Sequence, residues 1–428
     1  MIPSLSAAIT GIDANQTMLD VVGNNIANVN TTGYQAQSAQ FADLLNQQIA
    51  GATAPGPNFG GTNPVSVGSG TVVTANNTSF IQGTIVPTNV NTDVAIQGSG
   101  FLVGQLGNQQ VYTRNGALTT NSLGQLTTSN GAIIQGWMAP TPGGTITTTA
   151  PVGPVSVPKT EVAPAKESNR LNLTGNVPAG GGAFTITQDA FDNSGSSIPV
   201  AITFTPTATA GQWTMKAMVG SGAGAVDMYA TDPTVTFTNG QVSAVTGVTQ
   251  NASNAPVNPN GFDVKATWAS PPADFPQPFM VSFPAPSSPS AVTQYGGNQT
   301  VQVGSQDGYG VGAMTSFSIA QDGTINGNFS NGQTLALGQI ALANFANPNG
   351  LVHAGGTNYV GSVNSGPPQL GVPSSAGMGS LLGGSLENSN VDLGTELTNL
   401  IIAQNAYQAN TKVVTTSDQV LQALENMP

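Results

Sequence analysis

Two rows of apolar residues, one near each end of the 428-residue chain, repeat every seven residues and constrain the fold more than any other feature. A strict seven-residue repeat is typical of the narrow seam of a coiled coil rather than of the broad stripe of a globular helix. The spacing predicts one helix over residues 4–32, although Gly11 and Gly23 are poor helix formers. The N-terminal row consists of Leu5, Ile12, Leu19 and Ile26, with Val22 and Val29 each three positions further on.

The C-terminal row follows Ser389-Asn390-Val391-Asp392, a sequence that resembles a capping box at the start of a helix. The row of Gln404, Thr411 and Asp418 beside it is polar, so the apolar face is narrow. A helix with so narrow a face is marginal alone in water. Each end therefore needs a neighbour, and the simplest are the opposite terminus and another copy of the chain. The apolar positions are Leu393, Leu400, Tyr407, Val414 and Leu421, flanked by Leu397, Ile401, Val420 and Leu424.

Between the two ends the pattern changes to short β-branched runs separated by turn pairs. Asn-Gly and Asp-Gly accept the positive φ angles of tight hairpins. They occur at Asn115-Gly116, Asn130-Gly131, Asn239-Gly240, Asn260-Gly261, Asp322-Gly323 and Asn331-Gly332. The middle of the chain is therefore predicted to be all-β.

Shifts in composition predict a nested order of domains. Residues 1–33 and 388–428 form a terminal helical domain, and residues 34–72 and 376–387 form an extended connector or hinge. Residues 73–153 and 298–375 form a discontinuous β domain, into which 154–297 is inserted as an outer β domain between proline-rich stretches. The expected fold is mainly β, with two β domains and with the N- and C-terminal helices paired as a coiled coil.

Charge and composition exclude several classes of function. Charged residues make up 6% of the chain and the formal net charge is −12, which argues against nucleic acid because phosphates require clustered Lys and Arg. The chain has no cysteine and one histidine, and the common catalytic and phosphate-binding motifs are absent. No run approaches the ~18 apolar residues of a membrane span. We therefore expect no enzymatic activity, no cofactor, no metal and no membrane insertion.

Three weaker candidates have structural interpretations. Asp189, Asp192 and Asn193 have too few ligands for a calcium site, so a solvated turn is favoured. His353 precedes Ala-Gly-Gly without a partner base nearby, which indicates a surface residue. Arg114 lies in Tyr112-Thr113-Arg114-Asn115-Gly116, where a hydrogen-bond clamp at a hairpin is favoured over an anion site.

Motifs at both ends resemble those of the bacterial flagellar rod, hook and hook-associated proteins. Residues 96–103, 112–116 and 337–345 are similar to a β domain of the same family, whereas Gln35 and Asn405 stand where its members commonly have a charged residue. The N-terminal signature, residues 23–34, includes Asn24, Asn25, Asn28, Asn30, Thr32, Gly33 and Tyr34. The C-terminal signature, residues 389–393 and 402–414, includes Asn390, Asp392, Gln404, Ala409 and Asn410.

The resemblance implies a subunit that assembles into a helical tube and is exported without a cleaved signal peptide. Within the family, an insert as large as 154–297 favours a subunit of the hook, a curved and flexible extracellular tube that transmits torque from rod to filament. The implied partners are further copies of the chain, the distal rod, the hook cap, the hook-filament junction proteins and the export apparatus. The two apolar rows are then expected to form the assembly interface.

Two alternatives remain open from the sequence. A distal rod subunit belongs to the same family and differs in stiffness. A secreted β-rich adhesin or surface protein belongs to another class and corresponds to residues 73–375 taken alone.

Overall fold

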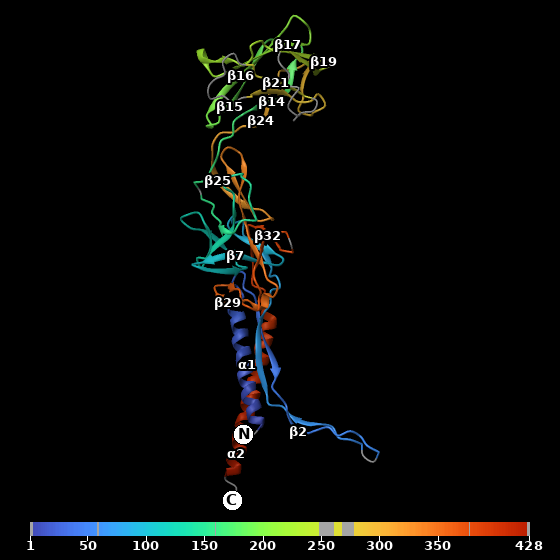
Figure 1. Ribbon diagram of the computed structural model, residues 1–428, viewed down its shortest axis with the longest axis vertical. Coiled ribbons are helices and arrows are strands. Elements are labelled where there is room, and N and C mark those ends of the chain that lie inside the picture. Colours follow the sequence, from blue (N-terminus) through green and yellow to red (C-terminus); the bar gives the residue numbers. More distant parts are fainter. Residues whose placement is uncertain are drawn as a thin grey trace. The chain divides into compact units, whose positions relative to one another are not determined.

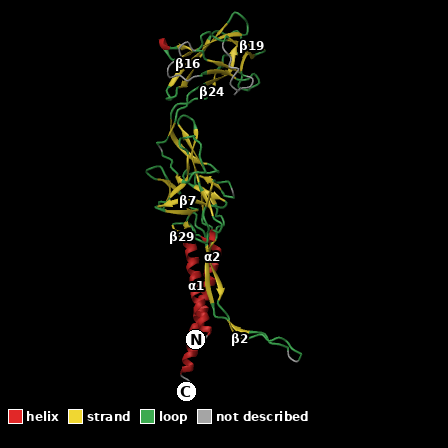
Figure 2. Ribbon diagram, viewed as in Figure 1, coloured by secondary structure: helices red, strands yellow, loops and turns green. Residues whose placement is uncertain are grey.

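The computed structural model describes residues 3–57, 60–158, 160–247, 261–267, 278–375 and 377–425, with only the backbone of Pro3, Ala223 and Leu424. Asn260 of one predicted turn, residues 270–277 of the second proline-rich stretch and the side chain of Leu424 lie outside this description. The chain is mainly β with one long helix near each end, which confirms the predicted fold class (Figure 2). It forms two compact units: residues 1–159, 317–327 and 336–428, and residues 160–316 and 328–335.

The first unit contains both helices, α1 (Pro3–Ala27) and α2 (Leu393–Glu425), which pack side by side (Figure 1). Gly11 lies against Asn410 and Asn25 lies against Glu396, so the two helices are antiparallel. Neither is long and apolar enough to cross a membrane, as far as their described residues show.

Both helix ends next to the β strands are fixed by local hydrogen bonds. Helix α1 ends at Ala27, before the predicted end at Thr32, because the chain turns there and the Thr31 N–H donates to the Asn28 carbonyl at 3.0 Å. Helix α2 begins directly after Asp392, whose Oδ1 accepts from the N–H groups of Gly394 at 2.8 Å and Thr395 at 3.3 Å. Asp392 is therefore the N-cap, rather than Ser389 of the predicted capping box.

A two-stranded ribbon follows α1 and packs against it. Strand β1 (Gln37–Asp43) pairs antiparallel with β4 (Thr71–Thr78), and the Thr71 N–H lies 3.3 Å from Thr10 Oγ1 of α1. Beyond the ribbon, β2 (Gln47–Ala50) pairs with β3 (Val65–Val67) in an arm whose strand residues are all exposed (Figure 1). These strands occupy the segment that was predicted only to be extended.

The β part of the first unit surrounds an aromatic core in which Phe101, Tyr112 and Phe345 meet at ring-centroid distances of 4.8 to 6.0 Å. Its main strand order is β27-β11-β7-β8-β30-β29, and the short pairs β6/β32 and β5/β33 lie outside this path. The strands are β5 (Ile85–Pro87), β6 (Val94–Gln97), β7 (Phe101–Leu106), β8 (Gln109–Thr113), β9 (Leu118–Thr120), β10 (Leu126–Thr128), β11 (Ile133–Met138), β12 (Gly153–Pro154), β28 (Leu342–Asn344), β29 (Val352–Gly355), β30 (Asn358–Val360), β31 (Gln369–Gly371), β32 (Ser380–Gly383) and β33 (Ser385–Glu387).

The second unit has its own core, built around Trp213, Phe204 and Phe283. Every second residue of β17 is buried, as expected for a sheet that packs on one face. Asn239 and Gly240 have φ angles of 53° and 77°, which confirms the predicted hairpin turn between β19 and β20. The strands are β13 (Val162–Ala163), β14 (Arg170–Pro178), β15 (Phe184–Phe191), β16 (Ser197–Pro206), β17 (Gln212–Val219), β18 (Val226–Asp227), β19 (Thr234–Thr238), β20 (Gln241–Thr246), β21 (Phe262–Lys265), β22 (Met280–Phe283), β23 (Val292–Tyr295) and β24 (Gln302–Gln306).

Three further strands carry residues of both units. They are β25 (Gly312–Ile319), β26 (Thr324–Phe329) and β27 (Thr334–Ile340).

Candidate assembly interface

Small side chains, rather than the predicted apolar rows, occupy the centre of the contact between α1 and α2. Ala8 and Ala14 of α1 and Ala403 of α2 are at most 3% exposed. A Cβ added to Gly11 would lie 2.7 Å from Asn410 Nδ2, so the absence of a side chain at this position lets the helices approach closely. On α2 the facing residues Glu396, Ala403, Asn410 and Ser417 also repeat every seven positions.

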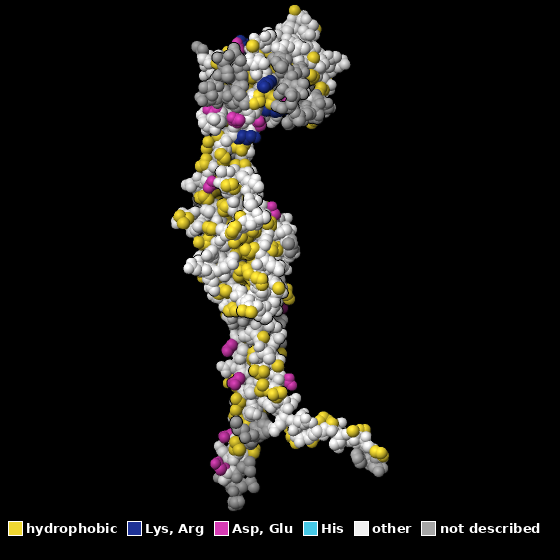
Figure 3. Space-filling view, in the orientation of Figure 1, with side chains coloured by type: hydrophobic (Ala, Val, Ile, Leu, Met, Phe, Trp, Pro, Cys, Tyr) yellow, Lys and Arg dark blue, Asp and Glu magenta, His cyan; other side chains and the backbone are white. Residues whose placement is uncertain are grey.

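The predicted apolar row of α2 lies largely on its solvent side. Ile401 is 56% exposed and Leu397 is 50% exposed. Leu400 and Val414 are half-buried, and the remaining described members, Leu393, Tyr407, Val420 and Leu421, are exposed. Figure 3 shows hydrophobic side chains on the surface of the helix pair and of the β2/β3 arm. Most of this row is therefore free to contact another molecule.

The predicted row of α1 is more covered than that of α2. Val22 is buried at 4% exposure, and its other members, Leu5, Ile12, Leu19, Ile26 and Val29, are half-buried. This difference arises because α1 is covered by α2 on one side and by β1 and β4 on another.

Asn25 of the N-terminal signature joins three elements through one buried amide. Its Nδ2 donates to the Gln37 carbonyl at 2.7 Å and to Glu396 Oε1 of α2 at 3.1 Å. Its Oδ1 accepts from the Gln37 N–H at 3.0 Å and from the Tyr34 hydroxyl at 3.1 Å. The amide thus uses both its donor and its acceptor atoms to fasten α1, the start of β1 and the start of α2 together.

Asn390 of the C-terminal signature makes the corresponding junction from the other end of the chain. Its Oδ1 accepts from the Ala36 N–H at 2.7 Å. Its Nδ2 donates to the Ser79 carbonyl at 2.7 Å, the Ile81 carbonyl at 2.8 Å and Gln35 Oε1 at 2.9 Å. Gln35 is fully buried. The two signatures therefore meet in space and hold the helix pair to the strands.

Gly33 and Arg114 connect the N-terminal signature to the β part of the first unit. Gly33 has a φ of 68°, and a Cβ there would lie 2.7 Å from the Asn115 nitrogen, so only glycine fits without strain. Arg114 donates to the Gly98 and Gly100 carbonyls and forms an ion pair with Glu387 at 3.3 Å. Its side chain is 3% exposed and that of Glu387 is fully buried. The hydrogen-bond clamp predicted at Arg114 is thereby confirmed, whereas the hairpin turn predicted at Asn115-Gly116 is wrong, because β8 pairs with β7 and β30 and β9 pairs with β10.

Burial also shifts the titration of groups at the junction. It raises the pKa of the Glu396 carboxyl; the Asn25 hydrogen bond opposes this shift and the nearby Asp392 carboxylate adds to it. Burial, and to a lesser degree the Glu396 charge, raises the pKa of the Tyr34 hydroxyl. Glu396 was not singled out from the sequence, although its position three residues after the Val391-Asp392-Leu393 motif was visible.

The remaining signature residues do not connect separate helices or strands. Asn24 Nδ2 donates to the Tyr34 hydroxyl at 3.2 Å, and Asn28 Nδ2 donates to the Asn24 carbonyl at 2.9 Å. Thr32 is half-buried, and the exposed positions are Asn30, Gln404 and Ala409.

The weaker candidates occupy structural positions. Asp192 Oδ1 accepts from the N–H groups of Ser194 and Ser196 at 2.9 and 2.8 Å, so it stabilises a turn. The Ser194 hydroxyl also donates to this oxygen, and these bonds, of which the Ser194 hydroxyl contributes most, lower the pKa of Asp192. Within the described ranges, no three His, Cys, Asp or Glu side chains are grouped so as to hold a metal ion.

A chain whose N- and C-terminal helices pair, with an apolar row left on the surface of the pair, has the architecture of a structural subunit. Comparison with known proteins agrees with this class. The flagella basal body rod protein model matches residues 5–35, and the flagellar hook protein FlgE/F/G D1 domain model matches residues 95–190. The flagellar basal body protein FlaE D2 domain matches residues 180–309, and the flagellar basal body rod FlgEFG protein C-terminal model matches residues 382–427.

Similar proteins extend over almost the whole chain. It is 33% identical to the flagellar hook protein FlgE of Treponema pallidum, over 98% of each chain. It is 32% identical to that of Borreliella burgdorferi, over 99% of each, and 32% identical to that of Salmonella typhimurium, over 99% of this chain and 100% of that protein. The solved Helicobacter pylori flagellar hook protein FlgE2 has a TM-score of 0.43 and 12% identity, covering 69% of this chain and 98% of that one.

The chain belongs to the flagellar hook protein family. It is a structural subunit that self-assembles into the bacterial flagellar hook. Its location is therefore the hook and basal body of the flagellum. Full-length similarity to hook proteins does not favour the distal rod or adhesin alternatives.

Proposed function

We propose that the exposed apolar row of α2 is the surface through which subunits cohere in the hook. The observation that carries the proposal is that α1 packs against the Ala403 face of α2, while Leu397 and Ile401 remain at least half exposed. Covering the exposed half of such a side chain contributes on the order of 1 kcal/mol. Several of them on each subunit, repeated along a tube, give cohesion without any new contact inside the subunit.

The test is a double variant, Leu397→Asp with Ile401→Asp, in the full-length chain. We expect the helix pair to remain folded by circular dichroism, because neither side chain lies at the α1 contact. The critical concentration for polymerisation, measured by sedimentation, should rise at least ~30-fold, since each ~1.4 kcal/mol lost corresponds to a factor of ten.

Asn405→Asp together with Gln419→Asp is the matched control pair, because these exposed polar positions of α2 take the same two charges without removing apolar surface. We expect it to polymerise like the unchanged chain. Polymerisation of the double variant at the original concentration, with folding intact, would show that cohesion resides elsewhere.

We further propose that the β2/β3 arm reaches a neighbouring subunit. A two-stranded hairpin is marginally stable alone in water. Leu45 is 91% exposed and Ile49 is 66% exposed, so the arm has apolar surface without cover among the described residues. A neighbouring copy supplies that cover.

The finer assignments belong to the same proposal. We expect residues 154–297 to form the outer, compliant domain, because surfaces of Asn, Gln, Thr and Ser make weak, water-mediated and exchangeable contacts. The distal rod, hook cap, hook-filament junction proteins and export apparatus are the expected partners beyond other copies. A role without catalysis is supported by the structural function of the relatives.

A further inference from the structure

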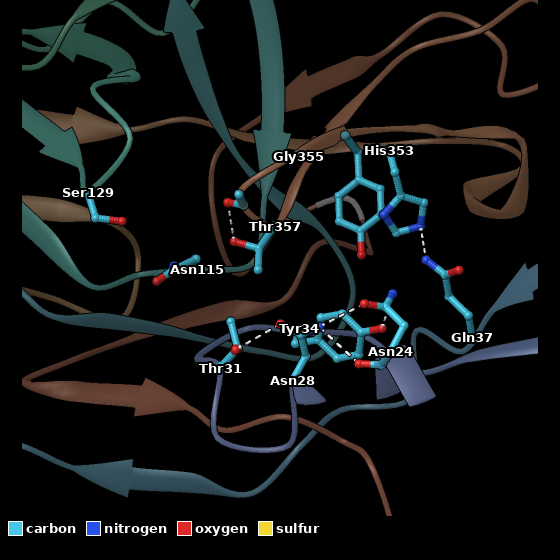
Figure 4. A pocket seen from close by; sticks show the side chains of 12 residues that line it. Asn24, Asn28, Thr31, Tyr34, Gln37, Asn115, Ser129, His353, Gly355 and Thr357 are labelled. Carbon is cyan, nitrogen blue, oxygen red and sulfur yellow. Dashed lines mark hydrogen bonds between the residues drawn. The ribbon is translucent and has the colours of Figure 1, made fainter. Parts of the chain in front are cut away.

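The chain's one histidine lies where the β1/β4 ribbon meets the rest of the first unit (Figure 4). His353, on β29, places Nε2 2.9 Å from Gln37 Nε2 and 3.1 Å from Thr78 Oγ1. Gln37 and Thr78 are paired across β1 and β4 at the root of the ribbon. The contact therefore joins both strands of the ribbon to the β29/β30 hairpin.

The partners define the state of the imidazole. An amide Nε2 can only donate, so Nε2 of His353 must accept from Gln37, and the Thr78 hydroxyl can donate to the same atom. An acceptor at Nε2 requires the neutral ring with its proton on Nδ1. Protonation of Nε2 replaces this acceptor by a donor that faces the Gln37 amide N–H.

We propose that His353 is a pH switch at the end of the β1/β4 ribbon formed by Gln37 and Thr78. The neutral imidazole accepts hydrogen bonds from both side chains, and protonation breaks these bonds. Gln37 and Thr78 form the end of the ribbon next to the β29/β30 hairpin, so release loosens this end; the β2/β3 arm leaves from the opposite end, at Asp43 and Thr71. This regulation goes beyond subunit cohesion and operates in the isolated subunit.

The surroundings favour the neutral ring. The Tyr359 ring of β30 packs against the imidazole at a centroid distance of 4.6 Å, and Tyr34 and Asn24 face it from the end of α1. The adjoining cavity, of about 400 Å³, is lined by amides, hydroxyls and rings, and none of its lining residues is a carboxylate that could stabilise an imidazolium. The two tyrosines beside the imidazole are themselves influenced by charged groups. The charges of Arg114 and Glu387 act on Tyr359, and the charge of Glu396 acts on Tyr34.

His353 is exposed as a whole, in line with the predicted surface residue, but partial burial of its imidazole lowers its pKa below the ordinary value of 6.5. The contribution of the neutral contact is complete above the ordinary pKa. It is lost as the pH falls through the lowered pKa of the folded chain.

The composition makes the test unusually direct. With one histidine, the imidazole resonance in an NMR titration of the full-length subunit needs no assignment. With no cysteine, Ala75→Cys on the exposed side of β4 carries a single nitroxide label whose mobility is read by electron paramagnetic resonance. We expect the imidazole to titrate below 6.5 and the label to become more mobile with the same midpoint.

Two variants separate release from other effects of acid. His353→Gln keeps a neutral acceptor that does not titrate, so the mobility step should disappear. Gln37→Ala keeps the imidazole but removes a donor, so its pKa should rise towards 6.5 and the label should be mobile at neutral pH. A step that persists in His353→Gln, an imidazole that titrates at 6.5 or above, or a label insensitive to pH in the unchanged chain would each overturn the proposal. None of these readouts depends on polymerisation.

Discussion

A single arginine shows how residues far apart in the sequence are held together in this subunit. Arg114 satisfies two carbonyls of its own hairpin region and the buried carboxylate of Glu387, 273 residues away. A clamp at Arg114 could be predicted from the Tyr112–Gly116 motif, but its acceptors could not, since the Gly98 and Gly100 carbonyls lie outside that motif, before β7. Glu387 could not be predicted, since nothing in the local sequence indicates which distant carboxylate pairs with Arg114.

Breaking this buried ion pair should cost far more stability than breaking an exposed one. Arg114→Met leaves the Glu387 carboxylate buried and unpaired, so we expect a loss of about 3–5 kcal/mol in the free energy of unfolding of the first unit. The measurement is urea denaturation followed by circular dichroism.

Lys216→Met is the matched comparison. Lys216 pairs with Asp227 at 3.2 Å, but the two side chains are 42% and 49% exposed. We expect this substitution to change stability by less than ~1 kcal/mol. Equal losses in the two variants would show that the Arg114 pair does not hold the junction.

The two helices show what a repeat in a sequence can and cannot predict. Seven-residue spacing was sufficient to locate both of them. It did not identify which face of α2 pairs with α1, because that face consists of Ala403, Asn410 and Ser417, and an apolar pattern draws attention to larger side chains. That the exposed row with Leu397 and Ile401 forms the interface between subunits stays a prediction.

The β1/β4 ribbon and the arm were visible in the sequence only as an extended segment. The arm strand β2 is exposed on both faces, and β1 is at most half-buried on the face that packs against α1, so neither strand carries a clear apolar alternation. Their pairing, and the contact of Gln37 and Thr78 with His353, required the structure.

The two glycines of α1 should respond to substitution with opposite signs. Gly11→Leu places a side chain where Asn410 already lies, and overpacking of this kind costs about 1–3 kcal/mol. Gly23→Ala has nothing within 4 Å of the added Cβ and should stabilise the helix by about 0.5–1 kcal/mol.

Thermal denaturation followed by helical circular dichroism distinguishes these two outcomes. We expect the Tm to fall for Gly11→Leu and to rise for Gly23→Ala. A rise in both would mean that α1 and α2 do not approach each other as closely at Gly11 as described.

At the scale of the whole molecule, the nested order of the two units predicts that the second can be removed without unfolding the first. Residues 162 and 313 are paired across β13 and β25, and the Met314 N–H donates to the Glu161 carbonyl at 3.1 Å. The two ends of the excised segment are therefore adjacent, and a two-residue turn can join them.

We expect a chain in which Asn-Gly replaces residues 163–312 to fold and still form tubes, because both helices and the ribbon are retained. Its tubes should differ from those of the full chain in curvature and bending stiffness, measured from electron micrographs. Tubes of unchanged curvature and stiffness would contradict the compliant role of the outer domain. Failure of the shortened chain to fold would contradict the independence of the first unit.

The antiparallel pairing of α1 and α2 also determines when, during synthesis, the helix pair can form. Asn25 meets Glu396, which lies 371 positions further along the chain, so during synthesis the first helix emerges from the ribosome long before its partner exists. Until translation reaches the last helix, α1 has only the β1/β4 ribbon of its own chain to pack against. The order of translation thus keeps a nascent subunit from closing early, without any separate inhibitor.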